Sequence, residues 1–228
     1  MSALEAVLFD LDGTLTDSRL GILRSARYAV ERLSAEKGRP FPLPDDSELG
    51  WIIGPPLRDS FAKLVGRENV EALMRFYLER YSPIGAFENY VYEGIPAALD
   101  ALRTRGTRLF VATSKNGRDA RRILEHFDLA PSFEGIHGAR ADGGRADKSE
   151  LIAFVLESEG LDRVQGRIAM IGDRKFDAIG ARAVGIAAIG ALWGYGGAEE
   201  LKAAGANPIV ETPLGVPDAV AQVFARAR

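Results

Sequence analysis

Short, uninterrupted hydrophobic runs alternate with segments of helical spacing along most of the chain. A strand buried on both faces of a parallel sheet reads as such a run, whereas hydrophobic residues three and four positions apart mark one face of a helix. The runs predict strands at residues 5–9, 108–113, 133–137, 167–171 and 186–189. Helical spacing predicts helices at residues 96–106, 116–128, 148–159, 177–184 and 199–204, and after residue 217.

A long segment without any strand pattern separates the first strand from the later ones. Within it, helices are expected at residues 18–35, after residue 45, and at residues 57–65 and 68–81. Alternation of strands and helices is typical of an α/β fold with a doubly wound parallel sheet. We therefore expect a core domain formed by residues 1–16 and 90–228, with residues 17–89 inserted as an all-helical cap domain.

Composition narrows the classes of partner and of metal site. The 228 residues include 29 basic and 32 acidic ones, for a net charge of -3, which is unlike the strongly basic surface of a nucleic-acid-binding protein. Cysteine is absent and only two histidines are present, so thiolate sites and three-histidine zinc sites are excluded. The longest uncharged run is too short and too rich in glycine for a membrane span. We expect a cytoplasmic monomer or homodimer that binds neither nucleic acid nor membrane.

Two carboxylates follow directly after the first predicted strand. Asp10 and Asp12 lie two residues apart, so in extended chain their side chains point to the same side, and Gly13 allows the backbone to turn. Two carboxylates held this close repel each other unless one is protonated or a cation lies between them. The pattern favours a magnesium-dependent nucleophile site over the simpler alternative of an Asp-Gly turn.

Polar residues also end two later strands and begin one helix. Thr113 and Ser114 come just before a helix, whose free N–H groups suit a phosphate. Lys148 lies in the first turn of a helix, where a cation opposes the helix dipole unless a carboxylate or phosphate is near. Asp173 follows the strand at residues 167–171, and Asp177 lies four positions on, on the same helical face. The structural alternatives are helix capping for the polar residues and a solvated surface position for the lysine.

The carboxyl ends of parallel strands meet at one edge of a sheet, so we expect all these side chains to lie together. Several carboxylate oxygens with few nitrogen ligands favour Mg²⁺ over transition metals. The sequence therefore predicts a magnesium site beside a phosphate-binding site.

The motifs resemble those of a known enzyme superfamily, in the same order and over nearly the whole chain. Asp10-Leu11-Asp12-Gly13-Thr14, Thr113, Lys148 and Gly172-Asp173 with Asp177 resemble the four motifs of the haloacid dehalogenase superfamily. The helical insertion is similar to that superfamily's first-position cap. Gly54-Pro55-Pro56-Leu57 and Trp193-Gly194-Tyr195-Gly196 resemble its phosphoglycolate phosphatase-like, 5'-nucleotidase-like branch.

The resemblance implies a role for each site residue. It makes Asp10 the nucleophile and Asp12 the general acid and base, and it makes Lys148 the cation that neutralises the nucleophile and the phosphate. Many relatives have proline where Ser149 follows that lysine, so Lys115 is the reserve candidate. The implied phosphoryl-binding residues are Thr113 and Lys148, and the hydroxyl of Ser114 is expected to add a donor beside them. The implied Mg²⁺ ligands are Asp10, Asp12 through its backbone carbonyl, Asp173 and Asp177.

These implications describe a magnesium-dependent phosphatase, a phosphoric monoester hydrolase that forms an aspartyl-phosphate. Phosphoglycolate and nucleoside monophosphates are the leading substrates among small-molecule phosphate esters. A phosphosugar mutase would use the same core residues, and a non-catalytic binding protein could share the fold, so both alternatives stay open. In the cap, we expect the loop from Gly54 to Arg58 to contact the substrate, with the arginine meeting a carboxylate or second phosphate unless it only faces solvent.

Overall fold

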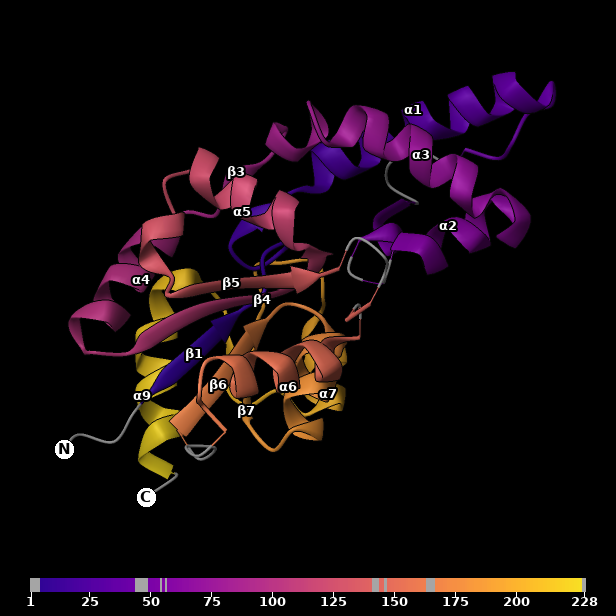
Figure 1. Cartoon of the computed structure of the whole chain (residues 1–228). Coiled ribbons are helices and arrows are strands. Elements are labelled where there is room, and N and C mark those ends of the chain that lie inside the picture. The colour runs from indigo at the N-terminus through magenta and orange to yellow at the C-terminus, as the bar shows by residue number, and fades with distance from the viewer. Residues whose placement is uncertain are drawn as a thin grey trace. The chain divides into compact units, whose positions relative to one another are not determined.

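A six-stranded parallel sheet lies at the centre of one of two structural units in the computed structural model (Figure 1). The structure describes residues 5–43, 49–53, 55, 57–140, 144–145, 147–162 and 167–226, without the side chains of residues 49 and 50. The first unit comprises Met1–Thr16 and Val91–Arg228, and the second comprises Asp17–Tyr90. In spatial order the strands are β5 (Gly135–Ala139), β4 (Arg108–Asn116), β1 (Ala6–Phe9), β6 (Ile168–Gly172), β7 (Ala187–Ala191) and β8 (Ile209–Val210).

Helices cover both faces of this sheet, because its hydrophobic strands are buried on both sides. One face packs against α6 (Lys148–Ser158), α7 (Lys175–Ala183) and α8 (Ala198–Ala204). The other packs against α4 (Ile95–Thr104), α5 (Gly117–His126) and α9 (Val216–Arg226). Alternate residues of β1 serve the two faces, so Ala6 and Leu8 join the core beneath α6 and α7. The prediction of a doubly wound α/β fold is confirmed.

The central position of β1 decides where the polar strand ends meet. It pairs with β4 on one side and β6 on the other, with Phe9 level with Val111 and Ile171. The residues that follow these three therefore emerge side by side at one edge of the sheet. In an open α/β sheet this is the edge at which ligands bind.

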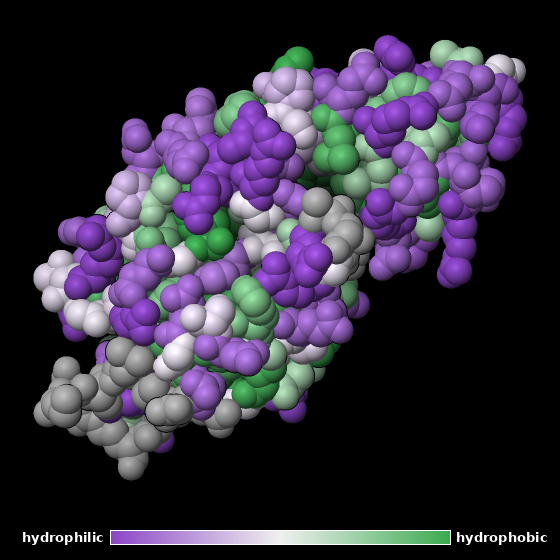
Figure 2. Space-filling view, viewed as in Figure 1, coloured by the Kyte–Doolittle hydropathy of each residue, from purple (hydrophilic) through white to green (hydrophobic). Residues whose placement is uncertain are grey.

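The second unit is helical, as the sequence predicts. It contains α1 (Arg19–Lys37), α2 (Leu57–Val65) and α3 (Val70–Tyr81), and α1 packs along α3. Its surface carries ion pairs such as those that Glu88 makes with Arg24 and Arg80. Figure 2 shows that on the visible face of the molecule most side chains are hydrophilic, with hydrophobic ones in small groups between them. The role of this unit as a cap stays a prediction.

Several details of the expected secondary structure were wrong or incomplete. The edge strand β5 lies two residues later than expected, and α7 begins at Lys175 rather than Asp177. Strand β8 was not predicted, and neither was the small sheet of β2 (Thr16–Asp17) and β3 (Tyr90–Val91), because two-residue strands have no periodicity to read. The helix expected after residue 45 falls partly outside the described residues, and Leu49–Ile52 form a 3-10 turn. In the described part of the chain, no helix is both long and apolar enough to cross a membrane.

Candidate active site

A tight loop directly after β1 carries the two aspartates of the first motif. The N–H of Asp10 donates to the carbonyl of Ile171 at 2.9 Å, which continues the pairing of β1 with β6. The carbonyl of Leu11 then accepts from the N–H groups of Leu15 and Thr16 at 2.9 and 3.0 Å, which closes the loop. Gly13 has a φ of 86°, a left-handed conformation that favours glycine.

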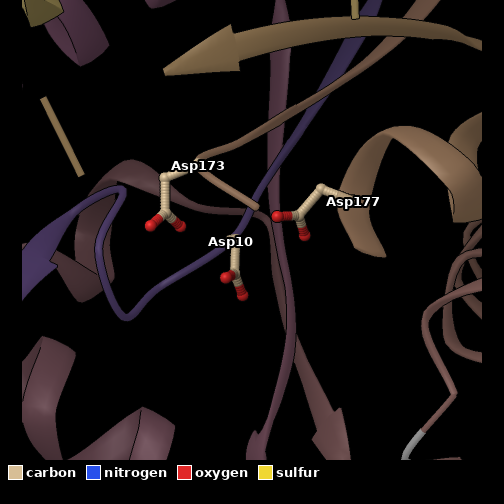
Figure 3. A group of neighbouring side chains, drawn as sticks. All are labelled: Asp10, Asp173 and Asp177. Atoms are coloured by element: carbon tan, nitrogen blue, oxygen red, sulfur yellow. The ribbon is translucent and has the colours of Figure 1, made fainter. Parts of the chain in front are cut away.

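Three carboxylates converge at this edge of the sheet (Figure 3). Asp10 comes from the end of β1, Asp173 follows β6, and Asp177 projects from the first turn of α7. One carboxylate oxygen from each lies within 4.8 Å of the others. Gly172 allows this approach, because a Cβ there would overlap the carboxyl group of Asp177.

Burial and mutual repulsion perturb two of these acids. Burial, together with the charges of Asp177 and Asp10, raises the pKa of the Asp173 carboxyl well above its usual value. Burial also raises the pKa of Asp177 to about 6, although the neighbouring Lys148 charge partly offsets the effect. The free energy of this site therefore favours a bound proton or a bound cation over bare charges.

Lys148 lies inside the acid cluster rather than in solvent. Its ammonium group is 2.9 Å from Oδ1 of Asp10 and 2.8 Å from Oδ1 of Asp177, and it donates to the carbonyl of Ala112 at 3.0 Å. Burial alone would lower the pKa of this lysine, but the two aspartate charges raise it above its usual value. The lysine is therefore held in its charged form, as a partner of the acids.

The start of α6 explains how a lysine is tolerated in its first turn. Asp147 caps the helix, and its Oδ1 accepts from the N–H groups of Ser149 and Glu150 at 2.8 and 3.2 Å. Gly180 of α7 faces Lys148, and a Cβ at that glycine would crowd the stem of the lysine. Ser149, which follows the lysine, thus contributes an N–H group that the cap satisfies.

The end of β4 brings a second lysine to the site. The ammonium of Lys115 lies 3.1 Å from Oδ2 of Asp12, so this residue pairs with the second aspartate. Thr113 is buried, and its hydroxyl oxygen accepts from the N–H of Lys115 at 3.2 Å. Ser114 between them is partly exposed. The structure thus gathers both lysines and both hydroxyl residues at the edge that also holds the acids.

The donor set fits a hard divalent cation. Asp10, Asp173 and Asp177 supply three carboxylates whose oxygens lie close together, and the ammonium of Lys148 contacts Asp10 and Asp177. When ionised, these carboxylates repel one another, and a bound cation would relieve that repulsion. Oxygen ligands of this kind suit Mg²⁺ or a similar ion.

A segment near the end of the chain holds the loop and the cluster together, and the sequence did not reveal this role. The indole N–H of Trp193 donates to the carbonyl of Thr14 at 2.9 Å, and the N–H of Tyr195 donates to Oδ2 of Asp173 at 2.7 Å. The hydroxyl of Thr14 donates to Oδ1 of the same aspartate at 3.3 Å. Both oxygens of Asp173 are thus fixed by neighbours, and a motif of two glycines beside two aromatic residues was the only signal.

Substituting alanine at Gly196 is expected to destabilise this segment by about 2 kcal/mol, a typical result of overpacking. A Cβ at Gly196 would overlap the carbonyl oxygen of Asp173, whereas at the adjacent Gly197 no atom lies within 4 Å of one. Thermal unfolding of Gly196→Ala and of the matched control Gly197→Ala measures the difference. Equal melting temperatures for the two variants would show that the close approach is unimportant.

The two cap residues predicted to contact substrate have different outcomes. Gly54 lies outside the described residues. Arg58 is in the first turn of α2 and forms an ion pair with Glu71 of α3, and both side chains are exposed. Hydrogen bonding to that carboxylate raises the pKa of the guanidinium. Its contact with substrate stays a prediction.

Comparisons with known proteins agree on a family. A model of haloacid dehalogenase-like hydrolases matches residues 7–191. A 5'-nucleotidase of Pseudomonas aeruginosa is 44% identical over 199 residues, which are 86% of this chain and 86% of that one. The tyrosine-protein kinase PtkA of Mycobacterium tuberculosis is 40% identical over 195 residues, 86% of this chain and 64% of that one. The crystal structure of a predicted phosphatase from Clostridium acetobutylicum matches with a TM-score of 0.87 and 38% identity, covering 97% of this chain and 100% of that one.

Proposed function

The chain belongs to the haloacid dehalogenase-like hydrolase family, which confirms the predicted family and the prediction of a phosphoric monoester hydrolase. On that premise we propose that it hydrolyses a small-molecule phosphate monoester in a Mg²⁺-dependent reaction through an aspartyl-phosphate. The observation that carries this proposal is the position of Asp10, which faces two buried carboxylates and is paired with a buried lysine. We propose a nucleoside monophosphate as the first substrate to test, because the 44% identical relative is named a 5'-nucleotidase.

In the proposed reaction, the residues of the first motif do the covalent and proton chemistry. A carboxylate oxygen of Asp10 attacks phosphorus, while the bond to the leaving alcohol breaks and Asp12 protonates that oxygen. Water then attacks the aspartyl-phosphate, Asp12 takes a proton from it, and inorganic phosphate leaves with Asp10 regenerated. Two steps of this kind replace one difficult displacement.

The remaining site residues bind and neutralise the phosphoryl group in this proposal. Lys148 offsets the charge of the nucleophile, and the hydroxyls of Thr113 and Ser114 are donors for the phosphoryl oxygens. Asp10, the backbone carbonyl of Asp12, and Asp173 would hold Mg²⁺, with Asp177 in support. When bound, the cation supplies charge neutralisation that lets an anionic carboxylate approach an anionic ester.

Phosphate release from a panel of esters tests the proposal. The purified protein is expected to release inorganic phosphate from 4-nitrophenyl phosphate and from at least one of a nucleoside 5'-monophosphate or phosphoglycolate. Release is expected with added Mg²⁺, and EDTA should reduce it to the background rate. A panel that yields no inorganic phosphate contradicts hydrolysis. Isomerised sugar phosphate without free phosphate would identify the mutase alternative.

A second candidate function follows from the relative named as a tyrosine-protein kinase. Transfer to a tyrosine hydroxyl instead of to water would use the same nucleophile and the same acid. Incubation with ATP and a tyrosine-containing peptide separates the two functions. Phosphotyrosine formed faster than inorganic phosphate favours the kinase, and the reverse order favours the phosphatase.

A further inference from the structure

We propose that Lys115 is a positioning residue, which holds one oxygen of the Asp12 carboxylate so that the other is left for proton transfer. The inference rests on the proposed function, in which Asp12 gives a proton to the leaving group and later takes one from water. It assigns to this lysine a task distinct from that of Lys148.

The two oxygens of the Asp12 carboxylate have different surroundings. Oδ2 lies 3.1 Å from the ammonium of Lys115, in a pair whose side chains are only 16% and 9% exposed. Oδ1 is buried and has no hydrogen-bond partner within the described part of the chain. A buried polar atom without a partner is costly and rare in folded proteins. The leaving oxygen of a substrate, or the attacking water, would supply the missing partner.

An irregularity in the sheet places the lysine there. Thr113 of β4 pairs with Gly138 of β5, and the next paired residues are Asn116 and Ala139. Between these two pairs β4 contains two residues and β5 contains none. The extra residues are Ser114 and Lys115. Bulges of this kind redirect side chains and often lie beside active sites. Gly138 permits the arrangement, because a Cβ there would overlap the carbonyl oxygen of Lys115.

The two lysines therefore serve different carboxylates. Lys148 contacts Asp10 and Asp177, and Lys115 contacts Asp12. Removing the Lys115 ammonium keeps the ion pair between Lys148 and Asp10 but frees the Asp12 carboxylate to rotate. The expected defect lies in proton transfer. A substrate whose leaving group needs no proton should therefore show a nearly normal first step, and comparison with other substrates should reveal the defect.

Lys115→Met should separate the two chemical steps. 4-Nitrophenolate leaves without a proton, so rapid-quench kinetics with this ester should show a first-turnover burst within about 3-fold of the wild type. Hydrolysis of the aspartyl-phosphate needs Asp12 as a base, so it should slow by about 10²-fold, and the phosphoenzyme should accumulate. For an alkyl phosphate, kcat/KM should fall by about 10²-fold as well.

Two further variants make the test specific. Lys115→Arg keeps a cationic donor and is expected to restore phosphoenzyme hydrolysis to within about 10-fold of the wild type. Lys202→Met removes an exposed lysine of α8 and should leave all rates unchanged. Melting temperatures of the three variants report whether each is folded, and a burst of full amplitude in Lys115→Met shows that its nucleophile is intact.

Other outcomes would overturn the inference. If Lys115 only bound the substrate phosphate, its loss would raise KM for aryl and alkyl esters equally, with no accumulated phosphoenzyme. A loss of the burst itself, or an arginine variant as defective as the methionine variant, would also contradict a positioning role. A wild-type protein that releases no phosphate from any ester overturns the proposed function and this inference together, whereas an active wild type with a uniform defect in Lys115→Met overturns this inference alone.

Discussion

Replacing Asp10 by Asn is expected to lower kcat for every phosphate ester by at least about 10⁴-fold, as loss of a covalent nucleophile does in other enzymes. Asparagine has nearly the same shape, but its amide is uncharged and cannot form the acyl-phosphate. The ion pair between Lys148 and Asp10 would be lost, while that between Lys148 and Asp177 would remain. The variant should therefore fold and bind but not react.

Acid-quenched samples measure the intermediate directly. The wild type should carry phosphate on Asp10 after mixing with 4-nitrophenyl phosphate, as mass spectrometry of the peptide that contains this residue would show. Asp10→Asn should carry none. The matched control is Asp100→Asn, which changes an exposed aspartate of α4 and should leave both turnover and labelling unchanged.

Retained activity in Asp10→Asn would remove the nucleophile from the mechanism. Turnover near that of the wild type would mean that water attacks the ester directly, and the aspartyl-phosphate would have to be abandoned. Similarly, near wild-type turnover of an alkyl phosphate by Asp12→Asn would remove the proposed acid and base. The two variants test separate roles, because the nucleophile is paired with Lys148 and the acid with Lys115.

Strand polarity explains why most of the site could be predicted from the sequence. The uninterrupted hydrophobic run of β1 requires burial on both faces, and that requirement fixes a central strand with a polar residue at its end. The same reasoning applies to β6, so Asp10 and Asp173 had to emerge at one edge of the sheet. Lys148 was assigned to the site through the family resemblance, because a cation in the first helical turn by itself left a solvated surface position open.

The features that the sequence did not reveal depend on contacts between distant segments. The pairing of Lys115 with Asp12 follows from two extra residues in β4, and no local pattern encodes such an irregularity. The hydrogen bonds of Trp193 and Tyr195 connect residues about 20 to 180 positions apart in the chain. Edge strand β5 was displaced in the prediction because an edge strand needs less hydrophobic sequence, and this one contains His137 and two glycines.

The stability of the metal-free protein is expected to fall as pH rises from 5 to 8. Burial raises the pKa of Asp177 to about 6 and raises that of Asp173 well above its usual value. At pH 5 the folded state keeps protons that the unfolded state, with a pKa near 3.9, has released. Stability conferred by a raised acid pKa is complete below the unfolded value and is lost as pH rises through the folded value. Between the unfolded and the folded pKa of each group, the free energy of unfolding falls by about 1.4 kcal/mol per pH unit, so Asp177 contributes mainly up to about pH 6.

Other carboxylates do not obscure this effect in the chosen range. The pKa values of Glu88, Asp147 and Glu200 are lowered, with hydrogen bonds to arginine or to Ser149 contributing in each case. Groups with lowered pKa values stabilise the fold above their unfolded pKa and lose that contribution on acidification. Above pH 5 the contribution is nearly fully present and hardly changes with pH. The range from pH 5 to 8 therefore lies above the titration of these three carboxylates.

Magnesium should counteract the loss of stability at high pH, because a divalent cation replaces the protons that the acid cluster holds at low pH. Mg²⁺ is expected to raise the melting temperature by several degrees at pH 8 and by little at pH 5, on a scale of about 2–4 °C per kcal/mol for a chain of this size. Asp173→Asn removes one of the repelling charges, so its metal-free form should lose less stability between pH 5 and 8. Asp100→Asn should behave as the wild type does. A metal-free protein that is equally stable at both pH values, or a Mg²⁺ effect of the same size at both, would contradict a cluster held together by a cation.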